Sequence, residues 1–116
     1  MTAPGEHAPG EPVTGEIAVI FASQRNGADD AGYLAAAQAM ETLARTQPGC
    51  RGIVSSRGAD GFGITISYWT DEAAAIAWRD HPDHAAIRDR GRAVWYDSYR
   101  VTVCEVMRGY DWRRGG

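Results

Sequence analysis

The sequence predicts an α+β fold in which four strands and two long helical segments alternate as βαββαβ. An apolar run opens the folded part, and two later segments carry apolar residues three and four positions apart, as helices do. An Asp-Gly turn separates two strand-like segments between them. Crossover rules then favour a ferredoxin-like split arrangement, with a four-stranded antiparallel sheet and both helices on one face.

Length and composition limit the chain to one folded unit. Its 116 residues match the size of a single domain. Residues 1–15 contain three Pro and three Gly with almost nothing apolar, so we expect a disordered leader there. The domain itself is expected over residues 16–111, followed by a short tail over residues 112–116.

The first strand and the first helix are defined by apolar spacing. Residues 17–22 are apolar at every position, which is typical of a strand covered on both faces. The pair Asp29-Asp30 offers an N-cap, and the apolar residues that follow have helical spacing up to Gln47. Pro48 and Gly49 then end this helix.

A hairpin, a broken helix and a last strand complete the predicted order. Residues 51–57 and 62–69 form the hairpin around residues 58–61. The helix over residues 71–80 is interrupted at Pro82, because proline can begin a helix but not continue one. Its second piece is expected to reach Tyr96, and the last strand covers residues 99–108.

Charge and residue usage exclude several classes of function. All 12 basic residues are arginine and the net charge is −3, so neither nucleic acid nor an anionic membrane is expected as a partner. Without lysine, Schiff-base and P-loop chemistry are excluded. No signal pattern or long apolar stretch is present, which predicts a cytoplasmic protein. The spacing of Cys50 and Cys104 indicates neither a zinc site nor a disulfide framework.

The strands carry apolar residues on both faces, although two helices can cover only one. A bare apolar sheet face is typical of a partner surface. We therefore predict a C2 homodimer in which two sheets pack face to face as a barrel.

Four stretches carry a resemblance to a known family: QPGCRGI, ITISYW, DEAAAIAWRDHPDH and GRAVWYDSYRV. They resemble the antibiotic biosynthesis monooxygenase superfamily of dimeric α+β barrels, over about residues 16–111. The resemblance implies a cofactor-free monooxygenase acting on an aromatic or polyketide-like molecule. It also admits a haem-degrading oxygenase, or a binding module of the same fold without turnover.

The resemblance also implies site residues. Trp, Tyr, Asn and Arg line the pocket of the quinone-forming members, and their counterparts here are Trp78, Tyr96, Gln24 and Arg92. The haem-degrading members carry their ligand His some ten positions beyond the helix Trp. His84 is six positions beyond Trp78, so haem degradation ranks third.

The residues themselves support a site for a flat organic ligand. His84 is the candidate base, since a pKa near 6.5 lets imidazole accept a proton at neutral pH; a buried histidine bonded to a backbone carbonyl is the structural alternative. His81 either begins a helix or contacts the ligand. The two imidazoles lack a third ligand, so no metal is expected, and no cofactor motif is present. The expected aromatic walls, with core packing as the alternative, are Trp69, Trp78, Trp95, Tyr96 and Tyr99.

Overall fold

The computed structural model describes residues 13–115 and confirms the predicted α+β fold. Residues 1–12, which hold most of the expected leader, lie outside the described part. The elements in chain order are β1 (Ile17–Arg25), α1 (Asp30–Arg45), β2 (Cys50–Arg57), β3 (Phe62–Trp69), α2 (Glu72–Arg79), α3 (Pro82–Arg90), a π-helical turn η1 (Gly91–Trp95) and β4 (Tyr96–Glu105).

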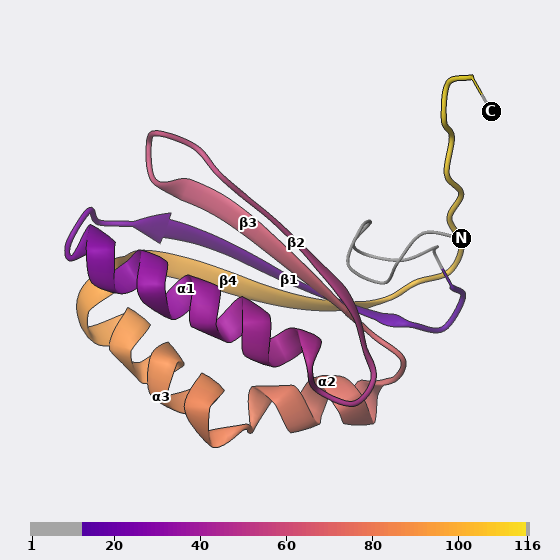
Figure 1. The fold of residues 1–116 in the computed structure, drawn as a ribbon, viewed down its shortest axis with the longest axis horizontal. Helices are drawn as coiled ribbons and strands as arrows, with labels where there is room; N and C mark the ends of the chain where they lie inside the picture. The colour runs from indigo at the N-terminus through magenta and orange to yellow at the C-terminus, as the bar shows by residue number, and fades with distance from the viewer. Residues whose placement is uncertain (1–12, 116) are drawn as a thin grey trace.

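The four strands form one antiparallel sheet in the order β2-β3-β1-β4. In its register Ile17 of β1 lies between Trp69 of β3 and Glu105 of β4. The helices gather on one side of this sheet (Figure 1). Because side chains alternate along a strand, Trp69 and Ile17 face the helices while Tyr68 and Ala18 face the open side.

Side-chain caps begin all three helices. The carboxylate of Asp71 accepts a hydrogen bond from the Ala74 N–H at 2.8 Å, and Asp29 caps α1 from a left-handed backbone conformation with φ of 52°. Nδ1 of His81 accepts the Asp83 N–H at 3.1 Å, with Pro82 in the first turn of α3. His81 therefore caps the start of α3, which is the first of the two roles expected for it.

The helical segment ends within one residue of the predicted Tyr96, but its last turn is not α-helical and the strand begins three residues before the predicted residue 99. The α-helix ends at Arg90, five residues continue as η1, and Tyr96 already begins β4. The aromatic ring of Tyr96 folds back against Gly91, where an added Cβ would lie 2.8 Å from it. A wide turn of this kind changes the helical phase, and a search for 3.6-residue spacing does not detect it.

Residues on the N-terminal side of the predicted boundary at residue 16 also contact the sheet. The Gly15 N–H donates to the Val106 carbonyl at 2.8 Å, and the Thr14 hydroxyl donates to the Met107 carbonyl at 3.2 Å. Glu16 is buried and its carboxylate lies 2.9 Å from Nε of Arg51. Residues 13–15 thus belong to the fold, and the residues that follow β4 run away from its body (Figure 1).

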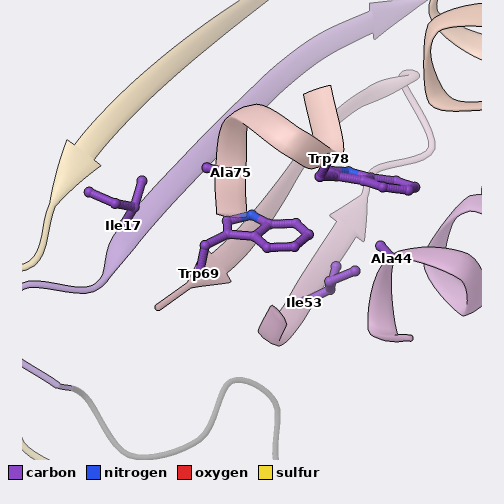
Figure 2. Packing of buried hydrophobic residues seen from close by; sticks show 6 residues of the cluster. All are labelled: Ile17, Ala44, Ile53, Trp69, Ala75 and Trp78. Atoms are coloured by element: carbon purple, nitrogen blue, oxygen red, sulfur yellow. The ribbon is translucent and has the colours of Figure 1, made fainter. Parts of the chain in front are cut away.

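The core lies between the helices and one end of the sheet. Its buried members are Ile17, Ala44, Ile53, Trp69, Ala75 and Trp78 (Figure 2). The indole rings of Trp69 and Trp78 stack with centroids 6.2 Å apart, and Trp69 is completely inaccessible to solvent. Two indoles bury more apolar surface than any aliphatic pair of residues could.

The open face of the sheet is apolar and exposed. Val54, Phe62 and Ile64 retain 41 %, 46 % and 41 % of their surface in solvent. They come from β2 and β3 and lie on the side opposite the helices, as the sequence predicted. Among the described helices, none has the length and apolar character needed to cross a membrane.

Candidate functional site

The structure divides the predicted site residues into two groups. One, which we call the Trp–His stack, comprises Trp69, Trp78, His81 and His84. The other, the tyrosine cluster, comprises Phe21, Tyr33, Trp95, Tyr96 and Tyr99. Both lie on the helix side of the sheet. Four residues of β1 separate Phe21 from Ile17, which pairs with Trp69, so the groups are about 13 Å apart along the strand.

The Trp–His stack is built by the chain reversal between α2 and α3. The imidazole of His84 lies flat on the indole of Trp78, with centroids 4.4 Å apart and an interplanar angle of 9°. Its Nδ1 is 3.0 Å from the carbonyl oxygen of Trp78. The ring of His81 contacts the same indole at 5.7 Å. One tryptophan thus orients both histidines.

These contacts set the protonation state of His84. Burial lowers its pKa below the ordinary 6.5, outweighing the bond to the Trp78 carbonyl, which raises it. The imidazole is therefore neutral at pH 7. A carbonyl oxygen can only accept a hydrogen bond, so Nδ1 carries the hydrogen and Nε2 keeps its lone pair. The hydrogen bond from Nδ1 to the backbone carbonyl of Trp78 thus leaves Nε2 of His84 as the atom that can accept a proton.

The tyrosine cluster fills the other end with edge-on aromatic contacts. Phe21 lies 5.5 Å from Tyr96 and 5.1 Å from Tyr99, and Tyr33 lies 5.9 Å from Tyr96. Burial, followed by the neighbouring Tyr33, raises the pKa of Tyr96, so its phenol stays protonated. The indole N–H of Trp95 donates to the Asp29 carboxylate at 3.3 Å. Trp95 and Tyr96 are thus chiefly packing residues.

An apolar shelf on the helix side of β4 connects the two groups. Val103 pairs with Val19, which packs on the core, and Tyr99 at the far end accepts a hydrogen bond from Nε of Arg92. The side chains of Val101 and Val103 are 51 % and 57 % exposed. They stay exposed because α3 packs mainly on α1, α2 and η1 and does not cover this part of the sheet. The shelf from Val103 to Tyr99 spans about 13 Å, which is long enough to hold a fused three-ring aromatic.

Gln24 does not join either group. It alternates with Ser23 and Arg25, so its side chain lies on the opposite side of the sheet from Trp78. There its amide donates to the carbonyls of Asp60 at 2.8 Å and Arg25 at 3.1 Å, which holds the β2–β3 turn against β1. A resemblance matched by residue type rather than by spacing did not detect this difference of face.

The sequence interpretation also missed residues that the structure brings to the site. Tyr33 of α1 was not among the predicted site residues, yet its ring contacts Trp95, Tyr96 and the guanidinium of Arg25. Among the described residues no cluster of three or more potential ligands could hold a metal ion, and the two imidazoles lack a third partner. The arrangement favours acid–base chemistry on an aromatic molecule.

Comparison with known proteins agrees with the fold. The family model described as antibiotic biosynthesis monooxygenase matches residues 17–90. The uncharacterized protein YqjZ of Bacillus subtilis (strain 168) is 48 % identical over 91 residues, which are 78 % of this chain and 79 % of that protein.

Two solved structures share the fold at low identity. Rv0793 from Mycobacterium tuberculosis superposes with a TM-score of 0.72 at 21 % identity, covering 81 % of this chain and 97 % of its own. SnoaB, a cofactor-independent oxygenase from Streptomyces nogalater, gives 0.70 at 18 % identity, covering 82 % and 96 %. With the match over residues 17–90, the chain belongs to the antibiotic biosynthesis monooxygenase family.

Proposed function

We propose that this protein is a cofactor-independent monooxygenase that oxidises an aromatic or polyketide-like small molecule with O₂. The observation that carries the proposal is the orientation of His84, whose Nδ1–H is bound to the Trp78 carbonyl and whose Nε2 is left as the proton acceptor. Family membership supports it, and so does the fold shared with SnoaB, which is described as a cofactor-independent oxygenase.

The chemistry requires a substrate that supplies its own electrons. His84 removes a proton from an acidic C–H or phenol of the substrate, and the resulting anion transfers one electron to O₂. The two radicals combine as a peroxide, which loses water. A CH₂ group thereby becomes C=O, with one oxygen atom in the product and the other in water. The shelf of Val101 and Val103 would hold the flat rings, and Arg92 and Tyr99 would donate to an oxygen at the far end.

Oxygen uptake by the purified protein tests this proposal. We expect at least one compound in a panel of anthrones and hydroquinones to consume O₂ faster than the enzyme-free blank, with a ketone or quinone as product. The same panel with heat-denatured protein is the control. Rates equal to the blank for every compound would overturn the proposal.

A binding module without turnover is the second candidate, and one observation favours it. Trp69 and Trp78 are 0 % and 8 % exposed, so their faces are already covered by each other and by His84. A ligand could then reach only the shelf of β4. Saturable quenching of tryptophan fluorescence by an anthrone that consumes no O₂ would support this candidate over the first.

We further propose that two copies pair through their open sheet faces. The exposed apolar side chains of Val54, Phe62 and Ile64 support this, since monomers seldom leave such a patch in solvent. Light scattering should then report twice the 12.6 kDa chain mass.

Ile64→Glu should reduce that mass to one chain. A carboxylate buried without a partner in an apolar interface costs several kcal/mol, on the order of a hundredfold or more in the dissociation constant. Leu34→Glu is the control, since Leu34 is an exposed apolar residue on α1, on the other side of the sheet. A mass that is the same for wild type and Ile64→Glu would contradict pairing through this face.

A further inference from the structure

A cleft of about 360 Å³ lies between the segment that follows β1 and the β2–β3 turn. Its wall is made of two arginines, two aspartates and small or polar loop residues: Arg25, Asn26, Gly27, Asp30, Arg57, Gly58, Ala59, Asp60 and Gly61. Neither His84 nor Trp78 belongs to it. The cleft is at the end of the sheet remote from the Trp–His stack, since Arg25 ends β1 while Ile17 begins it.

Arg57 is held across the sheet by neutral groups. Its guanidinium lies over Gly63, where an added Cβ would be 2.7 Å from the guanidinium carbon. Nη2 donates to the hydroxyl of the buried Ser23 at 2.7 Å, and Nη1 donates to the carbonyls of Ser23 and Gly61. The glycine and the buried serine therefore fix the position of this cation.

Two cations stand close together at this cleft. Arg25 and Arg57 lie over the same ring of Tyr33, at 4.1 and 5.3 Å from its centroid, so their guanidinium carbons are at most about 9 Å apart. Arg25 is 8 % exposed and pairs with Asp30 at 2.7 Å. Within residues 13–115, no ion pair involves Arg57. Of these two arginines, Arg57 is therefore the one without a carboxylate at ion-pair distance in the described part of the chain.

Asp60, the second acid of the cleft, forms no ion pair with Arg57 among the described residues. Oδ1 of Asp60 accepts the Phe62 N–H at 3.0 Å and so stabilises the turn. Of the five N–H donors of the Arg57 guanidinium, the bonds to Ser23 and Gly61 use three. A guanidinium with unused N–H donors and no carboxylate partner can donate hydrogen bonds to a planar anion.

We propose that this cleft binds a small organic carboxylate carrying a single negative charge. We assign a single charge because one guanidinium, that of Arg57, lacks a carboxylate partner, and the carboxylates of Asp30 and Asp60 in the same cleft would repel a dianion more strongly. The volume is within the range of known small-molecule pockets. The site is separate from the oxygenase site, so it stands or falls independently of the proposed activity.

Nuclear magnetic resonance with benzoate as the probe tests this site at pH 7. We expect saturable shifts of the Arg57 Nε–H resonance on titration with benzoate. Arg57→Gln should weaken benzoate binding by about tenfold or more, the effect of losing a charged hydrogen bond. Asp30→Asn should tighten it, since this removes a competing carboxylate that is 73 % exposed and not needed for packing. Arg79→Gln removes an exposed arginine outside the cleft and should change nothing.

The alternative outcomes are distinct. If phosphate binds more tightly than benzoate at pH 7.5, where phosphate is largely dianionic, the assignment to a singly charged carboxylate is wrong. If the Arg57 resonance does not move and Asp30→Asn leaves benzoate binding unchanged, there is no such site. The wild-type and Asp30→Asn measurements decide the question even where Arg57→Gln fails to fold, and none of them depends on oxygen consumption.

Discussion

Gly49→Ala is expected to lower the free energy of unfolding by about 3 kcal/mol or more. Gly49 joins α1 to β2 with φ of +84°, and its carbonyl accepts the Thr70 N–H at 2.8 Å. An added Cβ would lie 2.6 Å from Cβ of Ala74 and 2.7 Å from Oγ1 of Thr70. These distances are shorter than real contacts, so the loop must move away from α2. Urea unfolding followed by circular dichroism measures the loss.

Gly27→Ala is the matched control for this prediction. Gly27 has the same φ of +84°, but an added Cβ would meet nothing within 4 Å. It should therefore show only the backbone cost of a left-handed alanine, about 1 kcal/mol. The difference between the two variants measures the crowding against α2. Equal losses would mean that the close approach at Gly49 has no energetic consequence.

The second large effect is expected from His84→Gln. Removing a general base should reduce oxygen uptake with any accepted substrate by about 10²- to 10⁴-fold. His81→Asn is the control, because it removes the other imidazole against Trp78 while asparagine preserves the helix cap. Thermal melts of both variants serve to check that each is folded. If His81→Asn lost as much activity as His84→Gln, the base would have to be assigned anew.

The dependence on pH follows from the same burial. The pKa of His84 is lowered from 6.5, so a rate that needs its neutral form should be half-maximal below that pH, and NMR titration of the His84 ring should give a midpoint below 6.5. Because the unfolded chain then binds the proton more readily, stability falls as the pH drops from 6.5 through the folded pKa. A midpoint above 6.5 would contradict this description of the site.

The sequence was sufficient to predict the fold because local signals agreed with one another. The capping pair Asp29-Asp30, the Asp60-Gly61 turn and the helix start at Pro82 each indicated the element that formed. The π-helical turn and the early start of β4 were not predicted, because they depend on the ring of Tyr96 packing against Gly91, a contact formed only after the chain turns back.

The candidate site was predicted less completely. His84 and Trp78 are only six residues apart, and the break between α2 and α3, which Pro82 made predictable, brings them together. Arg57 of β2 donates a hydrogen bond to Ser23 of β1, although β3 lies between these two strands. The Arg57 side chain can cross β3 only because residue 63 is a glycine without a side chain. Contacts of this kind depend on the order of strands and on an absent side chain, neither of which has a local pattern.

The attachment of residues 14 and 15 to residues 106 and 107 places the start of β1 beside the end of β4. A short linker could therefore join these two points without disturbing a strand pairing. New ends could then be opened between Gly58 and Gly61, at the turn that lines the arginine cleft. Such a circular permutant would interrupt the chain at the arginine cleft and leave the segment that carries His84 continuous. It should therefore lose carboxylate binding and keep oxygen uptake.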